Sequence, residues 1–461
     1  MSTTDVARDS AISLRQAIHM QNAKAIELWL DVVDDPAERA YQLSRLSSAD
    51  RHRLGDMLTV DVAPKLLEAV DVHLAAKIIK SQPTPRAAEL LAAVDPQHAV
   101  KILRRYQPDH RDALLTAMPI DQARIQRGML LWRPDSVAAH MTTETLTVDP
   151  PTTAEEAVDQ IRHRISAQPV EGHIGSCVYV TGPDHELLGA VPLRSLVLAK
   201  ADRAMTDLMA DDVVTVNPLT SAEDAAHLCL NRRLEELAVV DADRRLLGIL
   251  TEDQAVDIVD DETTEDAEKQ GGSTPLEVPY LRASPWRLWR KRIIWLLVLF
   301  VAEAYTGTVL RAFEDEMEAV VALAFFIPLL IGTGGNTGTQ ITTTLVRAMG
   351  TGQVRFRDLP AVVAKEMSTG TLIAVAMAIA AMIRAWTLGV GPQIALTVTL
   401  TVAAIVMWSA LVSSILPLVL KKIRIDPAVV SAPMIATIVD GTGLMIYFVI
   451  AHATLPQLAG L

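Results

Sequence analysis

The hydrophobic pattern of the chain changes character near residue 290. From there to residue 452, apolar runs of about 20 residues, the length that crosses a bilayer, are separated by short polar turns. Before residue 290 the apolar runs are shorter and are interleaved with charge, which predicts folded domains in water. We place five membrane helices near 293–312, 319–346, 367–388, 394–420 and 428–452.

The first 135 residues follow the pattern of short helices, each with one apolar face. Pro96, Pro108 and Pro119 recur at nearly equal spacing, and each opens a new apolar segment. Proline suits the first position of a helix because the N–H that it lacks has no partner within the helix there. The pattern predicts an all-α superhelical N domain over residues 1–135.

Residues 136–260 contain an internal repeat. Residues 141–157 match residues 209–225, and the Leu-Leu-Gly of 187–189 recurs at 246–248. Each copy alternates strand and helix patterns, with short buried strands at 178–180 and 238–240. The duplication resembles a tandem pair of CBS domains, which implies α/β modules at 136–203 and 204–260 that sense a ligand. Residues 261–292 pass from acidic to basic, and we expect a connecting helix that leads into the membrane.

Charge divides the chain in the same place. Residues 1–281 carry 28 basic and 46 acidic residues, whereas residues 282–461 carry 14 basic and 9 acidic ones. An acidic soluble half argues against nucleic acid as a partner and favours cations. Cys177 and Cys229 lie far apart and have neither metal-ligand nor disulfide spacing.

The distribution of basic residues predicts the topology. With five spans and a cytosolic N-terminus, twelve Lys and Arg residues fall inside, and only Arg311 and Arg384 fall outside. Cytosolic loops are enriched in positive charge, and the N-terminus lacks the pattern of a signal peptide. We therefore expect a multi-pass protein of the cytoplasmic membrane, with its N-terminus in the cytosol and its C-terminus outside.

Two spans carry polar groups that lipid does not tolerate. The second holds a glycine-rich segment, residues 328–340, with Asn336, Thr337, Thr339 and Gln340 beyond what helix packing requires. The fifth holds Asp440 on a face of small residues, and an intramembrane carboxylate is a functional candidate by default. Glu303 in the first span is either a helix–helix hydrogen bond or a second cation contact.

At these residues the chain resembles the MgtE family of magnesium channels. The match rests on GTGGNTGTQ at 332–340, Ile-Asp-Pro at 425–427 and TIVDGTGLMIYF at 437–448, and it extends over essentially the whole chain. The resemblance implies a homodimer that imports Mg²⁺, with a pore lined by the second and fifth spans. Asp440, Asn336 and the carbonyl of Ala436 would hold the ion through its water shell, since Mg²⁺ prefers oxygen ligands and dehydrates reluctantly.

The resemblance also implies that cytosolic Mg²⁺ closes the pore by bridging acids at domain interfaces. The candidate sensor residues are Asp253, Asp257, Asp260, Asp261, Glu265, Asp266 and Glu277. The chain departs from the family around residues 273–284, where Thr274 and Arg282 stand in place of acids. We therefore expect incomplete closure.

Nucleotide binding by the CBS pair is expected to be weak. Pairs that bind ATP place an Asp three residues after a Ser or Thr, whereas Gln254 and Ser195 occupy the corresponding positions here. Two alternatives to a channel stay open, namely a carrier that couples Mg²⁺ to Na⁺ or H⁺ and a non-conducting membrane sensor. No phosphate loop, nucleophile constellation or Cys/His metal site indicates an enzyme.

Overall fold

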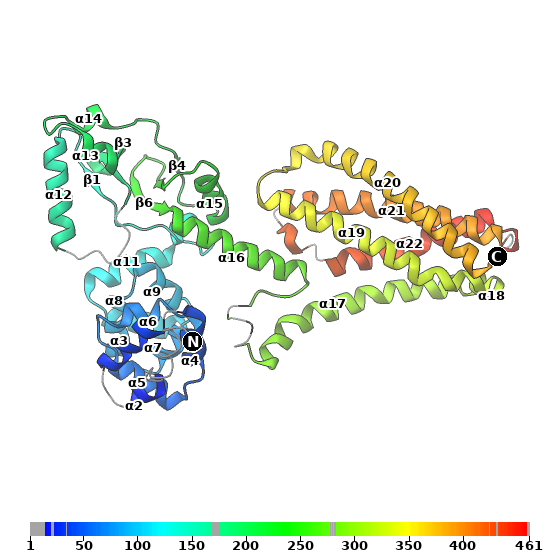
Figure 1. The fold of residues 1–461 in the computed structure, drawn as a ribbon, viewed down its shortest axis with the longest axis horizontal. Coiled ribbons are helices and arrows are strands. Elements are labelled where there is room, and N and C mark those ends of the chain that lie inside the picture. Colours follow the sequence, from blue (N-terminus) through cyan, green and yellow to red (C-terminus); the bar gives the residue numbers. More distant parts are fainter. Residues whose placement is uncertain are drawn as a thin grey trace, which may run out of the picture. The chain divides into compact units, whose positions relative to one another are not determined.

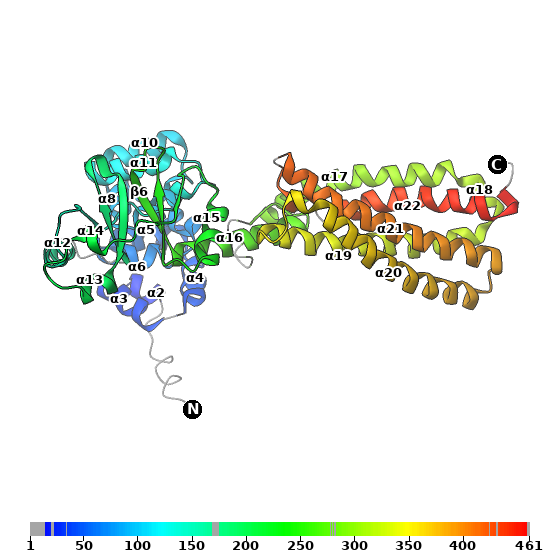
Figure 2. The same ribbon diagram turned by 90° about the horizontal axis from the view of Figure 1, so that it is seen from above.

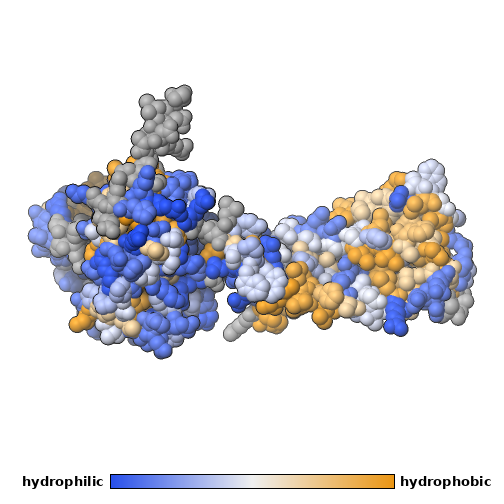
Figure 3. All heavy atoms as spheres, turned by 90° about the horizontal axis from the view of Figure 1, so that it is seen from below, coloured by the Kyte–Doolittle hydropathy of each residue, from blue (hydrophilic) through white to orange (hydrophobic). Residues whose placement is uncertain are grey.

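A computed structural model describes residues 14–19, 23–33, 35–167, 175–276, 278, 280, 283–423, 425–429 and 432–458. The chain divides into two compact units: a first of residues 1–262 with 277–282, and a second of residues 263–276 with 283–461. Figure 1 labels the elements of both. Surface colouring in Figure 3 shows hydrophilic residues over much of the first unit and broad hydrophobic areas on the second.

The N-terminal part of the first unit consists of short helices around one apolar core, as predicted. Pro96 and Pro108 occupy the first positions of their helices, whereas Pro119 is the residue before its helix. Asp95 caps its helix by accepting hydrogen bonds from the backbone N–H groups of Gln97 and His98. The described helices are α2 (Leu14–His19), α3 (Ala23–Val32), α4 (Pro36–Ser44), α5 (Ser48–Met57), α6 (Ala63–Leu67), α7 (Val72–Lys80), α8 (Thr84–Ala93), α9 (Pro96–Leu103), α10 (Pro108–Ala117) and α11 (Ile120–Leu131).

The internal repeat forms two three-stranded sheets of the same topology. In each sheet the first strand pairs in parallel with the second, and the second pairs antiparallel with the third, with a register shift at the same place. The first copy comprises β1 (Thr147–Val148), α12 (Ala154–Ala167), β2 (Cys177–Thr181), β3 (Leu187–Pro192), α13 (Leu193–Leu198) and α14 (Met205–Leu208). The second comprises β4 (Thr215–Val216), α15 (Ala222–Asn231), β5 (Glu236–Val240), β6 (Leu246–Thr251) and α16 (Glu252–Gln270).

Next to each repeated Leu-Leu-Gly, the third strand of one copy pairs with the segment that begins the other copy. Thr142 and Ile249 exchange two backbone hydrogen bonds, and so do Ala190 and Ala210. A Cβ on Gly248 would lie 2.5 Å from the carbonyl oxygen of Thr142, so only glycine permits this approach. The hydroxyl of Tyr179 in β2 also donates to a carboxylate oxygen of Glu236 in β5, at 3.0 Å. The two copies are therefore tied into one pair.

Among its described residues, the second unit contains five helices that are long and apolar enough to cross a membrane, by length and composition. Its elements are α17 (Pro285–Ala312), α18 (Glu314–Ala319), a 3₁₀ turn (Val321–Phe326), α19 (Ile327–Gly350), a 3₁₀ turn (Phe356–Asp358), α20 (Leu359–Leu388), α21 (Pro392–Lys422), a 3₁₀ turn (Pro427–Val429), α22 (Ala432–Thr454) and a 3₁₀ turn (Pro456–Leu458). Helix α19 packs against both α21 and α22, and α20 packs against α21 (Figure 2). The common core includes Phe326, Ile405, Val439 and Tyr447.

The expected connecting helix over 261–292 differs from what the structure contains. Helix α16 already begins at Glu252 and ends at Gln270, because Gly271 and Gly272 follow and Gly272 adopts a positive φ of 72°. Helix α17 starts at Pro285, where the side chain of Ser284 accepts a hydrogen bond from the backbone N–H of Arg287. The connection is thus two helices separated by a non-helical stretch at 273–276.

Candidate functional site in the membrane unit

Asp440 lies midway along α22 and faces α19. The side chain is half-buried, and its Oδ1 atom is enclosed without a hydrogen-bond partner among the described residues. A Cβ placed on Gly335 of α19 would lie 3.7 Å from this oxygen and 3.3 Å from the Cβ of Ala436, one turn earlier on α22. The structure therefore brings Asp440 and Ala436 together against the same glycine.

Glycines allow α19 to approach its neighbours this closely. A Cβ on Gly334 would lie 2.7 Å from side-chain carbons of both Ile405 and Val439, and one on Gly338 would lie 2.5 Å from Ile435. The hydroxyl of Ser409 in α21 donates to the carbonyl of Gly334 at 2.8 Å. These contacts fix the rotation of α19 about its axis, and with it the side that α19 turns away from α21 and α22.

The side of α19 that its neighbours leave exposed is polar. Asn336, Gln340, Thr343 and Arg347 are all exposed, at spacings of three or four residues that place them on one face of the helix. Thr337, which the sequence singled out beside Asn336, is buried, and its hydroxyl bonds to the carbonyl of Thr333 in the same helix. Packing thus accounts for Thr337 but not for the exposed stripe of Asn336, Gln340, Thr343 and Arg347.

Two further acidic features lie in this unit. Glu303 is exposed on α17, the helix whose Tyr305 and Thr306 lie against Gly441, the residue after Asp440. The acidic turn predicted after the first span is α18, where Glu316 is buried and lies 3.0 Å from Nε2 of His452. Glu316 therefore ties α18 to the end of α22, whereas Glu314, Asp315 and Glu318 are exposed.

Six of the seven candidate sensor residues lie along α16. Asp253, Asp257, Asp260 and Asp261 belong to the part of α16 in the first unit, and Glu265 and Asp266 to the part in the second. Among the described residues, no three His, Cys, Asp or Glu side chains gather closely enough to hold a metal ion. Glu277 and Arg282 lie outside the described residues.

Lys269, at the end of α16, is ion-paired in the structure and was not among the residues predicted from the sequence. Nζ of Lys269 lies 2.5 Å from Oδ2 of Asp426, in the loop between α21 and α22, and 2.7 Å from Oε1 of Glu265. Burial alone would lower the pKa of Lys269, but its hydrogen bonds to Asp426 and Glu265 outweigh that effect and raise it. Burial, followed by the charge of Asp426, raises the pKa of Asp266. The i, i+4 spacing of Glu265 and Lys269 was the available sequence signal.

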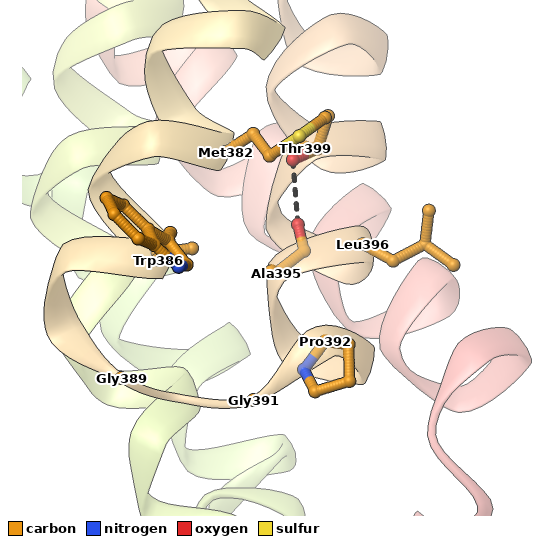
Figure 4. A pocket seen from close by; sticks show the side chains of 9 residues that line it. Met382, Trp386, Gly389, Gly391, Pro392, Ala395, Leu396 and Thr399 are labelled. Carbon is orange, nitrogen blue, oxygen red and sulfur yellow. Dashed lines mark hydrogen bonds between the residues drawn. The ribbon is translucent and has the colours of Figure 1, made fainter.

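A separate groove of about 640 Å³ lies between the adjoining ends of α20 and α21. Figure 4 shows Met382 and Trp386 on one side and Pro392, Leu396 and Thr399 on the other. The hydroxyl of Thr399 is bonded to the carbonyl of Ala395 at 2.7 Å, which leaves the lining largely apolar. None of the candidate residues lines this groove.

Comparison with known proteins identifies the family to which these domains belong. A family model described as a divalent cation transporter matches residues 327–450, the MgtE intracellular N domain matches 34–135, and CBS domains match 137–202 and 205–261. The magnesium transporter MgtE of Thermus thermophilus is 35% identical over 321 residues, 70% of each chain. The chain belongs to the MgtE family. MgtE of Bacillus subtilis is 28% identical over 348 residues, 75% of each chain.

Solved structures of MgtE cytosolic regions are also similar to part of this chain. One, the cytosolic domain of the Mg²⁺ channel MgtE in complex with ATP, is 24% identical and covers 54% of this chain and 99% of its own, with a TM-score of 0.47. The family models and the curated relatives confirm the MgtE resemblance drawn from the glycine-rich segment and the residues around Asp440. The family models also agree with the predicted fold class of helical N domain, CBS pair and helical membrane region.

Proposed function

We propose that this chain is a Mg²⁺ channel of the cytoplasmic membrane and that it imports Mg²⁺ as a homodimer. The observation that carries the proposal is the placement of Asp440. Its Oδ1 lies against Gly335 without a hydrogen-bond partner among the described residues, and Gly335 immediately precedes Asn336 of the polar exposed stripe of α19. Polar side chains that faced lipid at this depth would be unfavourable, so this stripe requires water or protein beside it. A water-filled path between two copies meets that requirement.

The chemistry of the stripe suits a hydrated Mg²⁺ ion. Carboxylate, amide and carbonyl oxygens are the ligands that hard cations prefer, and Mg²⁺ releases its waters reluctantly. In the proposed dimer, two Asp440 carboxylates supply charge, while the side-chain oxygens of Asn336 and the carbonyls of Ala436 accept hydrogen bonds from the water shell. The absence of nitrogen and sulfur ligands from this set disfavours softer metals.

Regulation by cytosolic Mg²⁺ is part of the proposal. Helix α16 carries Asp253, Asp257, Asp260, Asp261, Glu265 and Asp266, and it runs from the CBS pair into the unit that contains the pore helices. Cations that screen or bridge these acids would favour one placement of the helix over another. A ligand shifts such an equilibrium only by the difference in its affinity for the two states.

Two other functions remain to be distinguished by experiment. A coupled carrier is favoured by Glu303, an exposed carboxylate within the first predicted span, because intramembrane carboxylates mark ion and proton pathways in transporters. A non-conducting sensor would need no polar stripe on α19. Current recorded from purified protein in bilayers separates a channel from a carrier, because a carrier's flux would require the Na⁺ or H⁺ gradient.

The proposal is tested with Asp440→Asn, which keeps the size of the side chain and removes its charge. Mg²⁺ entry into vesicles that contain the purified variant, followed with an internal Mg²⁺ dye, should fall to the level of protein-free vesicles. Glu303→Gln is the matched control, because it also removes one intramembrane carboxylate, and a channel should keep most of its flux. Undiminished flux through Asp440→Asn would show that Asp440 does not line the pore and would contradict the proposal.

A further inference from the structure

The last turn of α16 is fastened to the loop that leads into α22. Lys269 places its ammonium group 2.5 Å from Oδ2 of Asp426 and 2.7 Å from Oε1 of Glu265, and its side chain is only 22% exposed. The other carboxylate oxygen of Asp426 accepts a hydrogen bond from the backbone N–H of Ala428, at 2.9 Å. Asp426 thus orders the turn before α22 with one oxygen and holds Lys269 with the other.

Other bonds of this segment are less dependent on charge. The backbone N–H of Thr274 donates to the carbonyl of Lys291 at 3.0 Å, and Arg347 reaches the hydroxyl of Thr263 at 3.4 Å. A Cβ on Gly272 would lie 2.7 Å from the ring of Trp295. These contacts place the end of α16 beside α17 and α19, but they do not neutralise any carboxylate.

The balance of charge explains why Lys269 matters. Asp426 and Glu265 both lie against the ammonium group of Lys269, and the charge of Asp426 also acts on Asp266. Arg347 is the other basic group that acts on Asp266. Without the ammonium group between them, Asp426 and Glu265 would repel each other, and the end of α16 would move away from the loop.

We propose that Lys269 is a positioning residue whose ammonium group keeps the end of α16 on the loop before α22 in the absence of any bound divalent cation. The inference rests on the proposed function, because it concerns how the cytosolic half acts on the helix that carries Asp440. Its consequence is that Mg²⁺-dependent movement belongs to the acids at residues 253–261, while residues 263–276 stay attached.

The test compares variants of the full-length protein in detergent, with and without Mg²⁺. Chymotrypsin cleavage after Tyr280 reports whether the segment that follows α16 is held. Wild-type protein should be cut at the same rate in EDTA and in Mg²⁺. Lys269→Met should be cut about fivefold faster in EDTA, the scale expected for losing a partly exposed ion pair, and Mg²⁺ should restore its protection by taking the place of the ammonium group.

Two further variants separate positioning from a general loss of folding. Lys269→Arg keeps the charge and should behave like the wild type. Lys269→Gln keeps a polar side chain without the charge and should be cut as fast as Lys269→Met. Equal cleavage of Lys269→Met and wild type in EDTA, or cleavage of Lys269→Arg as fast as that of Lys269→Met, overturns the proposal.

A flux measurement keeps this inference distinct from the proposed function. Lys269→Met should conduct Mg²⁺ and need a higher cytosolic Mg²⁺ concentration to close. Asp440→Asn should lose flux and keep wild-type protection from chymotrypsin. Flux that persists in Asp440→Asn would contradict the proposed pore. If Lys269→Met is cut faster but closes at the same cytosolic Mg²⁺ concentration as the wild type, the attachment of α16 does not influence α22.

Discussion

At the scale of single residues, the glycines of α19 have different tasks although they stand within a few positions of one another. Gly334 and Gly338 meet Ile405, Val439 and Ile435, so they serve packing. Gly335 faces Ala436 and Asp440, so it shapes the candidate pore. Gly332 meets nothing within 4 Å. These contacts allow folding and transport to be separated by alanine substitutions in one helix.

Gly338→Ala is expected to destabilise the membrane unit, because its Cβ would lie 2.5 Å from Ile435 and 2.8 Å from the hydroxyls of Ser409 and Ser413. Overpacking of this kind costs about 1–3 kcal/mol, which a lower midpoint of thermal unfolding in detergent would report. Gly332→Ala, with open space around its Cβ, is the control and should leave the midpoint unchanged. An unchanged midpoint for Gly338→Ala would mean that α19 and α22 are not packed as described.

Gly335→Ala is expected to act on transport more than on stability. Its methyl group would lie 3.3 Å from Ala436 and 3.7 Å from Oδ1 of Asp440, in the place where water or a hydrated ion would meet the carboxylate. Mg²⁺ flux per folded protein should fall severalfold, while the unfolding midpoint moves less than that of Gly338→Ala. Full flux through Gly335→Ala would argue that ions do not approach Asp440 from α19.

At the scale of elements, the beginning of α16 bears on nucleotide binding. The side chain of Gln254 accepts a hydrogen bond from the backbone N–H of Thr251 at 3.0 Å, and the hydroxyl of Thr251 accepts one from the N–H of Gln254 at 3.4 Å. This reciprocal pair is a capping box. Gln254 is thus occupied in starting the helix, and it lacks the carboxylate that would accept two ribose hydroxyls.

We therefore expect ATP to bind weakly, and Gln254→Asp to strengthen binding. A charge-assisted hydrogen bond contributes roughly 1.5–3 kcal/mol, which corresponds to about 10- to 150-fold in affinity. Calorimetric titration of the full-length protein with ATP measures the change, with Gln270→Asp at the opposite end of α16 as the control. Micromolar affinity in the unaltered chain would contradict the prediction.

How much of this could be predicted from sequence depends on the range of the interaction. Apolar runs located five spans, but the first turns of α17 and α20 were missed because Arg287, Arg290 and Glu366 make them polar. Asp440 was evident as a lone carboxylate in an apolar run. Its contact with Gly335 was not, because the rotation of α19 depends on Ile405, Ser409 and Val439. The pair of Lys269 and Asp426 spans 157 residues and leaves no local pattern.

At the scale of the whole molecule, an odd number of spans predicts that the two ends of the chain lie on opposite sides of the membrane. Twelve basic residues fall on one side and two on the other, which predicts that residues 1–292 lie in the cytosol. Cys177 and Cys229 are the two cysteines of the chain, so a background without cysteine needs two substitutions. Single cysteines can then report each side.

In that background, an impermeant maleimide added to intact cells should label Gln457→Cys and should not label Gln353→Cys. Both positions are exposed, and they follow α22 and α19 respectively. Lysed cells, in which both should react, provide the control for accessibility. Labelling of Gln353→Cys from outside would reverse the orientation, and labelling of neither in intact cells would require an even number of spans.

The glycine-lined face of α19 also has a consequence for biosynthesis. Of the five candidate spans, the one that contains α19 has the lowest mean hydropathy, and the side chains that fill its glycine face belong to α21 and α22, which the ribosome delivers later. Until α22 emerges, α19 lacks the contacts that Ile435, Ala436 and Val439 provide, and its own surface is not strongly apolar. A nascent chain that ends before residue 431 should therefore be held poorly by the bilayer and removed by quality-control proteases, so integration of this protein is completed only when its last helix arrives.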